Sequence, residues 1–503
     1  MTFENVYMEV SRLFNNRPML TWFENGEKKS FDSDGFYRMT DKTAKILEKK
    51  FMNIPKGSWI GLKCRNSPLW YPVFFGLLKI GYPVLLLDSA IDDMALVSFV
   101  EQSAMKGIVS DKPENLDSVI CCETSEIDLS ESGTPDSVSW EHRIAFCTSG
   151  TTGQAKIYVF YADAVMEQSI NIRKVYNENK IIAATGAGDE KADYSVLQSL
   201  PQRHCLGFGL TILMWSWGYP MMMPEMDGIF SVADTCRKYG IWGLCTVPAI
   251  WKGLFRMAQA RFGKCDSEAM HKLLGDKIGL AVSAGARLDE SLAQKALQSG
   301  IDFWNGWGMT ETSFVTVGDI AEDDSVDYVG VLVNKHTTEI TDSGELTVNG
   351  STLYNSTLVN GVEIPRDVNS YYHTGDIFTV KNGRYYFKGR CKSVIIREDG
   401  ENIYIDELES HFRFLDECAE QFCIFELSES PALVIFSRNG INETVTEKIK
   451  QINYSLPQPK RIMKAYISSQ PLPMTSKGEV SRYYMAAYIG ENNADMEELS
   501  LRR

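Results

Sequence analysis

Hydroxyl side chains, two glycines and a lysine lie close together in the stretch FCTSGTTGQAK, residues 146–156. Glycine lets backbone N–H groups turn toward a phosphate, while hydroxyl groups add donors and lysine adds positive charge. A Walker loop would need G-x-x-x-x-G-K-[ST] before a helix, but here Gly150–Gly153 is followed by Gln-Ala-Lys156 and the strand-like IYVFY. The Rossmann glycine pattern is also missing. The stretch alone therefore leaves two interpretations, a plain turn or an anion site of another kind.

The surrounding sequence predicts the elements that would position this stretch. Residues 56–88 alternate apolar runs with one helix-like segment, which is the strand–helix–strand spacing of a parallel sheet. The pattern recurs up to about residue 300, in KIIAAT, IWGLCTVPA and IGLAVSAG. After residue 320, short runs joined by Asn-Gly predict antiparallel strands. We expect an α/β protein whose large N-terminal domain, residues 1–390, holds parallel-type sheets plus a small β unit.

The last part of the chain predicts a third pattern of helices and strands. IDELESHFRFLDECAEQF predicts a helix, CIFELSESPALVIFS predicts a hairpin and ETVTEKIKQINYSL predicts another helix. We therefore expect residues 391–503 to form a small, mobile C-terminal α+β domain.

Composition excludes several kinds of partner. The formal charge of −15 disfavours nucleic acid and anionic membrane surfaces as general partners. The 11 cysteines show no CxxC pair and the six histidines are dispersed, so we expect no zinc site. We expect a cytoplasmic location for the same cysteine pattern. The uncharged stretch 205–224 is long enough for a membrane span, but Gly218-Tyr219-Pro220 interrupts it, so we expect a buried helix and strand.

Six stretches in order resemble the motifs of the adenylate-forming superfamily, which includes acyl-CoA synthetases, peptide-synthetase adenylation domains and beetle luciferases. TSGTTGxxK resembles its phosphate loop. YHTGD at 372–376 matches its Y-x-T-G-D motif, and GRCKSVIIREDGENIYIDELE at 389–409 resembles its hinge segment. The other three are PQRHCLG at 201–207, SAGARL at 283–288 and NGWGMTE at 305–311. The chain is most similar to acyl-CoA synthetases, and the resemblance covers nearly all of it.

The resemblance implies that the chain joins a carboxylic acid to ATP and then passes the acyl group to a thiol. Lys156 and the loop would hold the leaving phosphates, Thr310 would contact the α-phosphate, and Glu311 would bind Mg²⁺. Asp376 would accept the ribose hydroxyls and Arg390 would contact ribose or phosphate. Singly, each of these residues also suits a turn or a surface ion pair. The loop residues are Thr148, Ser149, Gly150, Thr151, Thr152 and Gly153, and those around adenine are Gly285, Ala286, Asn305, Gly306 and Trp307.

The resemblance also bears on the acid and the thiol. Amino-acid-activating relatives usually carry an aspartate after the histidine segment, whereas this chain has none there, so a fatty or aryl acid is expected. His204 and Met309 would contact that acid, although His204 is nearly as consistent with a structural role. Trp215, Trp217, Met221–Met223 and Trp251 suit either an apolar cleft or the core. Lys392 would be the hinge, and coenzyme A or a separate carrier protein would supply the thiol.

One position departs from the family pattern. The family closes with L-P-x-T-x-x-G-K-[IV]-x-R, whose lysine bridges the acid and the α-phosphate, but this chain reads LPMTSKGEVSR and holds Glu479 there. Three interpretations stay open. Lys477 or another cation substitutes for the lysine, or adenylation is slow and the chain serves mainly thiol transfer, or the chain is a degenerate, regulatory relative. We favour an active enzyme because the other motifs are present.

Overall fold

The computed structural model describes residues 2–128, 130, 133–148, 156–178, 194–333, 335–391, 394–396, 402–428, 430–438, 440–474, 480–482, 485–492 and 495–501. The contacts divide the chain into two compact units. The first contains residues 1–337 and 348–372, and the second contains 338–347 and 373–503. Residues 338–347 and 373–390 thus group with the C-terminal residues, while Lys392 lies outside the described residues. The hinge, and a domain boundary at 390/391, stay predictions.

The first unit contains an eight-stranded sheet in the order β19-β18-β8-β7-β4-β3-β5-β6. Its centre is parallel, because β3 (Ile60–Lys63) pairs in parallel with β4 (Val84–Leu86) and β5 (Gly107–Ser110). Helix α3 (Trp70–Lys79) joins β3 to β4, which confirms the strand–helix–strand unit predicted for residues 56–88. The remaining strands and the helix between β4 and β5 are β6 (Ile120–Glu123), β7 (Arg143–Thr148), β8 (Lys156–Tyr161), β18 (Ser356–Val359), β19 (Val362–Pro365) and α4 (Asp93–Ser103).

Most strands of the larger sheet also belong to the first unit, in the order β15-β14-β13-β12-β11-β9-β10-β1-β2. The strands from β13 to β1 in this order are parallel to their neighbours, whereas β14, β15 and β2 pair antiparallel. The bounds are β1 (Leu20–Glu24), β2 (Glu27–Phe31), β9 (Val196–Leu197), β10 (Met221–Met222), β11 (Gly243–Thr246), β12 (Leu280–Ala284), β13 (Asp302–Met309), β14 (Ser313–Asp319) and β15 (Tyr328–Leu332).

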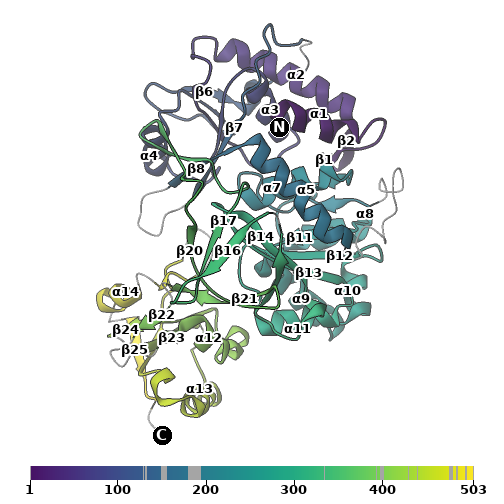
Figure 1. Ribbon diagram of the computed structural model, residues 1–503. Coiled ribbons are helices and arrows are strands. Elements are labelled where there is room, and N and C mark those ends of the chain that lie inside the picture. The colour runs from purple at the N-terminus through teal and green to yellow at the C-terminus, as the bar shows by residue number, and fades with distance from the viewer. Residues whose placement is uncertain are drawn as a thin grey trace. The chain divides into compact units, whose positions relative to one another are not determined.

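Helices cover both faces of this sheet, and the side chains that alternate along a strand pack into a different core on each face. Figure 1 shows β11, β12 and β13 between α5 and α7 on one side and α9, α10 and α11 on the other. Leu280 and Val282 of β12 pack into the core with α7, whereas Ala281 packs into the opposite core. Both faces of a parallel strand are buried in this way, which explains its continuous apolar run. The helices are α1 (Phe3–Arg12), α2 (Ser33–Lys50), α5 (Ala162–Glu178), α7 (Cys205–Ser216), α8 (Ile229–Tyr239), α9 (Pro248–Phe262), α10 (Ser267–Leu274) and α11 (Glu290–Gln298).

The uncharged stretch 205–224 forms α7 followed by β10, as the sequence predicts. Both elements are buried in the core of the first unit. Within the described ranges, no helix is both long and apolar enough to cross a bilayer.

The described residues of the second unit contain three sets of strands. In the first set, β20 (Tyr372–Lys381) and β21 (Arg384–Arg390) form a hairpin whose turn residues Asn382 and Gly383 have φ of 52° and 76°. Positive φ at both positions is the geometry that makes Asn-Gly a hairpin signal. Asn360-Gly361 forms the same two-residue turn between β18 and β19 in the first unit. β16 (Thr337–Ile340) and β17 (Glu345–Asn349) complete this set.

The second set is a four-stranded sheet in the order β24-β25-β26-β27. The predicted hairpin is β24 (Gln421–Leu427) with β25 (Ser430–Phe436), and the last predicted helix is α13 (Glu443–Ser455). The helix predicted from residue 405 is shorter than expected, because α12 (Ile405–Ser410) gives way to a 3-10 turn at Arg413–Glu417. The third set is the antiparallel pair β22 (Val394–Ile396) and β23 (Asn402–Tyr404). The other elements are β26 (Lys464–Ser468), α14 (Met485–Glu491) and β27 (Met496–Leu499).

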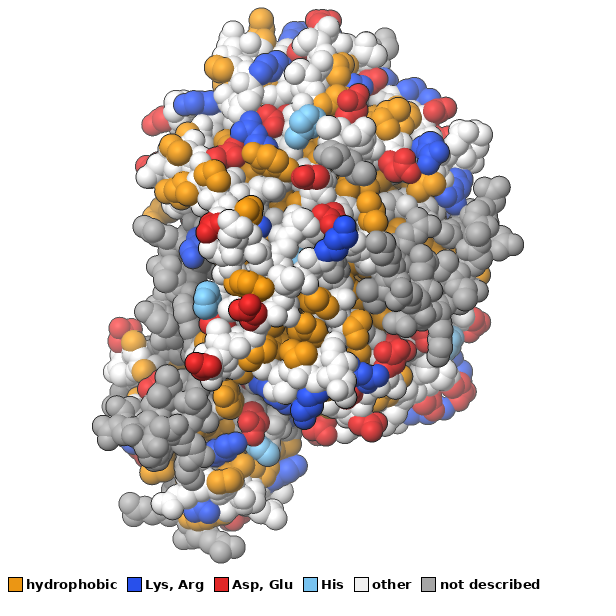
Figure 2. All heavy atoms as spheres, in the orientation of Figure 1, with side chains coloured by type: hydrophobic (Ala, Val, Ile, Leu, Met, Phe, Trp, Pro, Cys, Tyr) orange, Lys and Arg blue, Asp and Glu red, His pale blue; other side chains and the backbone are white. Residues whose placement is uncertain are grey.

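Charged side chains are interspersed on the face that Figure 2 shows. On the first unit, Lys and Arg side chains alternate with Asp and Glu side chains, and the residues coloured by type form no continuous basic area there.

Candidate functional site

The anion-binding stretch connects two antiparallel strands. Thr148 ends β7, Lys156 begins β8, and the two are cross-strand partners. Lys156 is exposed and opens a strand, whereas a Walker loop would open a helix. Ser149, Gly150, Thr151, Thr152 and Gly153, which lie between them in sequence, are outside the described residues.

The residues predicted around adenine lie where β12 ends and where the neighbouring parallel strand β13 passes beside that end. Gly285 comes directly after β12 and has a φ of +84°, which an L side chain rarely adopts, and Ala286 beside it is exposed. In β13, Asn305 and Gly306 pair with the last two residues of β12. Because the carboxyl ends of parallel strands share one edge, these residues meet at the usual ligand-binding edge of an α/β sheet.

The surroundings of Asn305 and Gly306 explain their residue types. Asn305 is buried and its Nδ2 donates to the Tyr328 carbonyl over 3.3 Å, so its side chain holds β15. A Cβ on Gly306 would lie 3.4 Å from the Thr316 carbonyl oxygen. Trp307, the next residue, is half-buried.

Thr310 and Glu311 lie in the tight turn between β13 and β14. Met309 ends β13, and its N–H donates to Thr312 Oγ1 over 3.2 Å, which fixes the turn. Thr310 Oγ1 accepts from the Cys205 thiol over 3.8 Å, so the first turn of α7 approaches this site. Glu311 is only 9% exposed. The turn thus presents a hydroxyl and a nearly buried carboxylate side by side.

Three tyrosines surround Glu311. The Tyr158 ring is 5.0 Å from that of Tyr354, which is 5.9 Å from that of Tyr372. Burial raises the pKa of Tyr158 and of Tyr372, and the Glu311 carboxylate beside them raises both further. Tyr158 lies on β8 two residues after Lys156, so the hairpin that carries Lys156 lies against the turn that carries Glu311.

Sequence reasoning missed the roles of Tyr158 and Tyr354. A signal was present for Tyr158, because residues 156, 158 and 160 share one face of a strand. Tyr354 lies in an irregular connection between β17 and β18, and its N–H donates to the Glu311 carbonyl over 3.1 Å. No periodicity marks such a position.

Asp376 and Arg390 lie opposite each other in the second unit. They are cross-strand partners in the β20–β21 hairpin, with Arg390 Nε 3.6 Å from Asp376 Oδ1. Asp376 is 5% exposed, and its N–H donates to Thr374 Oγ1 over 3.1 Å. The structure therefore brings these two predicted ribose-binding residues together.

The flanks of the closing segment are also in the second unit. Met474 and Val480 form an antiparallel bridge, and the Ser481 N–H donates to the Pro473 carbonyl over 2.8 Å. Arg482 pairs with Asp406 over 3.0 Å and also with Glu409. Lys477 and Glu479 lie outside the described residues.

The histidine segment leads into α7. His204 is exposed and occupies the N-cap position of α7. Gly207 cannot carry a side chain, since a Cβ there would lie 2.2 Å from the Pro201 carbonyl oxygen. This close approach explains the spacing of proline and glycine in PQRHCLG.

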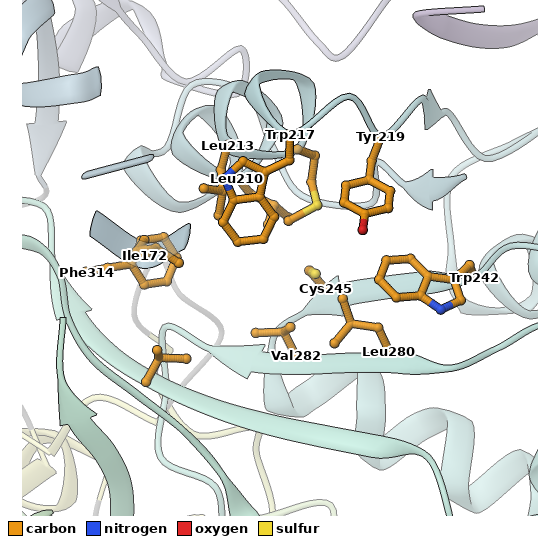
Figure 3. A pocket seen from close by; sticks show the side chains of 12 residues that line it. Ile172, Leu210, Leu213, Trp217, Tyr219, Trp242, Cys245, Leu280, Val282 and Phe314 are labelled. Atoms are coloured by element: carbon orange, nitrogen blue, oxygen red, sulfur yellow. The ribbon is translucent and has the colours of Figure 1, made fainter. Parts of the chain in front are cut away.

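An apolar cavity of about 20 Å³ lies between α7 and the sheet. Figure 3 shows Leu210 and Leu213 above it, Leu280 and Val282 below it, and Trp217 beside them. Of the residues proposed from the sequence for an apolar cleft, Trp217 lines this cavity, whereas Trp215 and Trp251 are fully buried in the cores. The described lining residues are Ile172, Leu210, Leu213, Met214, Trp217, Tyr219, Trp242, Cys245, Leu280, Val282, Phe314 and Val317.

Known proteins resemble this chain along most of its length. A 2-succinylbenzoate–CoA ligase of Staphylococcus epidermidis is 24% identical over 355 residues, which cover 67% of each chain. A ligase of the same name from Listeria innocua is 23% identical over 475 residues, covering 91% of this chain and 94% of that protein.

The fold is shared with solved structures. An o-succinylbenzoate CoA synthetase (MenE) of Bacillus subtilis, in complex with the acyl-adenylate intermediate OSB-AMP, superposes with a TM-score of 0.77 at 16% identity. The match covers 96% of this chain and 97% of that one. A profile described as "AMP-binding enzyme" matches residues 9–353, more than half of the 503 residues, and the chain therefore belongs to the AMP-binding enzyme family.

Proposed function

We propose that this chain is an acid–thiol ligase that uses ATP. A carboxylate oxygen of the acid attacks the α-phosphorus of ATP, the bond to the β-phosphate breaks, and pyrophosphate leaves with the electron pair. The thiol of coenzyme A then attacks the acyl carbon of the adenylate, and AMP leaves. The acid is of the fatty or aryl class, and the location is the cytoplasm, in keeping with 11 cysteines that are all free.

One observation carries this proposal: the convergence of Tyr158 and Glu311. Tyr158 belongs to the hairpin of Thr148 and Lys156, and Glu311 belongs to the turn that also carries Thr310. Donors suited to phosphates and a carboxylate suited to a metal therefore lie in the same part of the first unit. Two anions can react only where their repulsion is neutralised, and such a site supplies that environment.

The residues present fit Mg²⁺ at Glu311. The carboxylate is nearly buried, and within the described part of the chain no lysine, arginine or histidine forms an ion pair with it. A buried carboxylate without a cationic side chain suits a divalent cation, whose charge would offset that of the phosphates when bound.

The other residues take roles in binding and positioning. Lys156 and the residues from Thr148 to Gly153 would hold the β- and γ-phosphates, and the Thr310 hydroxyl would donate to the α-phosphate. Asp376 would accept hydrogen bonds from the ribose hydroxyls, with Arg390 beside it. Gly285, Ala286, Asn305, Gly306 and Trp307 would enclose adenine, and His204 and Met309 would lie next to the acid.

Two alternatives remain distinct from this proposal. A stand-alone adenylation enzyme would load a carrier protein and react little with coenzyme A. Glu479 in place of the usual lysine argues for the second alternative, a degenerate relative. Such a protein would bind ATP but release no pyrophosphate with any acid.

The test is acid-dependent exchange of labelled pyrophosphate into ATP, followed by thioester formation with coenzyme A or a carrier protein. We expect exchange with fatty or aryl acids, and a loss of at least about a hundredfold in Lys156→Ala. Lys272→Ala, which removes an exposed lysine of α10, serves as the matched control. ATP binding without exchange for any acid would contradict the proposal.

A further inference from the structure

The apolar cavity begins beside the residues proposed to bind the nucleotide. A Cβ on Gly306 would lie 3.8 Å from Cε1 of Phe314, and Phe314 also lines the cavity. A Cβ on Gly285 would lie 3.4 Å from Leu206 Cδ2, in the first turn of α7. One end of the cavity therefore adjoins the edge of the sheet where Gly285 and Gly306 lie.

Helix α7 connects Thr310 with the cavity. Cys205, at the first position of the helix, contacts Thr310, and Leu210, Leu213 and Met214 line the cavity one to three turns later. The nine residue steps from Cys205 to Met214 rise about 14 Å along the helix. Thr310 thus lies at the N-terminal end of the helix whose later turns line the cavity, and an acid with its carboxylate near Thr310 could extend its organic group in that direction.

The described walls of the cavity are uncharged. They consist of aliphatic and aromatic side chains, the Met214 thioether and the Cys245 thiol. Burial raises the pKa of Cys245 to about 12, so its thiol stays neutral. These apolar walls suit a hydrocarbon group. The space of about 20 Å³ has room for one water, so a six-carbon chain or a ring enters only if some of the lining side chains move.

Two stacked aromatic rings close the far end. Tyr219 and Trp242 have ring centroids 5.2 Å apart at an interplanar angle of 16°, and Trp242 also packs edge-on against Tyr194 at 5.7 Å. Figure 3 shows Tyr219 and Trp242 at the end opposite Phe314. A long organic group would also have to displace this stack.

We propose that this cavity selects the acid, and that the chain activates uncharged monocarboxylic acids with a short chain or a single ring and rejects acids with a second carboxylate. The inference rests on the proposed function and specifies its substrate class. An unpaired carboxylate among these walls would lose its hydration without gaining a partner. Since 2-succinylbenzoate carries two carboxylates, this specificity differs from the activity for which the relatives are named.

The first experiment compares matched acids in the pyrophosphate-exchange assay with the full chain. Hexanoate and hexanedioate have equal length, and benzoate and 2-succinylbenzoate share a ring. We expect the acid with a single carboxylate to exceed its partner in kcat/KM by at least about a hundredfold in each pair. We also expect hexanoate to exceed hexadecanoate.

The second experiment changes the cavity. Leu213→Ala enlarges it, and we expect the ratio of kcat/KM for dodecanoate to that for hexanoate to rise about tenfold. Ile212→Ala is the matched control, because Ile212 is buried in the same helix but does not line the cavity, and it should leave the ratio unchanged. Calorimetric ATP binding verifies that both variants are folded.

The outcomes separate the two proposals. Equal or better exchange with hexanedioate or 2-succinylbenzoate would overturn the inference and leave the ligase function intact. An equal change of the chain-length ratio in both variants would also overturn it. Exchange with no acid, despite ATP binding, would overturn the proposed function and the inference together.

Discussion

At the scale of single residues, the site combines a nearly buried carboxylate with phenol groups from distant parts of the chain. Glu311 is reached by Tyr158 from β8 and by Tyr372 from the start of β20. Hydrogen-bonding neighbours of a metal-binding carboxylate orient it and tune its affinity for the metal. The tyrosines are therefore expected to act on Mg²⁺ binding through Glu311, without contacting substrate.

The corresponding prediction concerns Tyr158→Phe, which removes one hydroxyl and keeps the ring. We expect the Mg²⁺ concentration for half-maximal exchange to rise about tenfold, because the carboxylate loses an orienting partner. Titration of Mg²⁺ at saturating ATP and acid measures this value. Tyr161→Phe on the same strand is the control, since that side chain is exposed. An unchanged Mg²⁺ requirement in Tyr158→Phe would contradict the assignment.

A second prediction concerns His336 and pH. Burial lowers the pKa of His336 to about 4, below the ordinary value of 6.5, and its Nε2 lies 3.3 Å from the Phe314 carbonyl oxygen. Below pH 6.5 the unfolded chain binds a proton that the folded chain rejects, so stability present above pH 6.5 is lost as pH falls toward 4. The loss amounts to about 3 kcal/mol at most for the unit that contains His336.

Urea unfolding measured between pH 7 and 4.5 tests this prediction. His336→Gln should lessen the fall in the unfolding midpoint, whereas His411→Gln, at an exposed histidine, should leave it unchanged. Parallel profiles for the wild type and His336→Gln would show that other groups cause the pH dependence.

At the scale of elements, glycines determine how closely α7 approaches its entry loop. Gly207→Ala places a Cβ against the Pro201 carbonyl, whereas a Cβ on Gly209 in the same helix would meet nothing within 4 Å. We expect Gly207→Ala to destabilise the first unit by about 1–3 kcal/mol and to lower exchange activity. Gly209→Ala should be neutral or stabilising, because alanine favours a helix. Thermal unfolding of both variants measures the difference, and equal midpoints would contradict it.

Local patterns predicted many of the elements, for particular physical reasons. Strand–helix–strand spacing predicted β3, α3 and β4, and Asn382-Gly383 predicted a hairpin, because each signal is contained within its own segment. The helix predicted from residue 405 was too long, because apolar residues of the 3-10 turn at Arg413–Glu417 continue the run after α12. Asn349-Gly350 resembles a hairpin turn, but β17 ends there and β18 begins only at Ser356.

The candidate site was predictable only in part. Gly285, Gly306, Thr310 and Glu311 belong to compact motifs and lie together at one sheet edge. The contacts of Glu311 with Tyr158 and Tyr372 join residues far apart in sequence, so no local pattern contains them. The cavity likewise combines α5, α7 and several strands, and its walls look like ordinary core residues in sequence.

At the scale of the whole molecule, the contacts define two units connected by several passages of the chain. Thr310 and Glu311 belong to the first unit, whereas Asp376, Arg390 and the flanks of the closing segment belong to the second. An enzyme that uses groups from two units for two successive steps is expected to depend on a movable connection.

The prediction at this scale concerns Lys392→Pro, at the proposed hinge. Proline fixes φ and removes a donor, so rotation of the backbone there is restricted. We expect thioester formation from the adenylate to fall at least about tenfold while pyrophosphate exchange changes less. Rapid-quench measurement of each half-reaction separates the two steps, with Lys392→Ala as the control for loss of the side chain. Equal losses in both steps would contradict a hinge at this residue.

The position of two indole rings in the cavity wall has a practical consequence. Trp217 and Trp242 are two of the ten tryptophans in the chain, and both border the space proposed for the acid. An incoming organic group would alter the surroundings of both fluorophores before any bond is made or broken. Emission spectra recorded without ATP would then report ligand occupancy optically, which allows compound libraries to be screened at equilibrium and without coupled reagents.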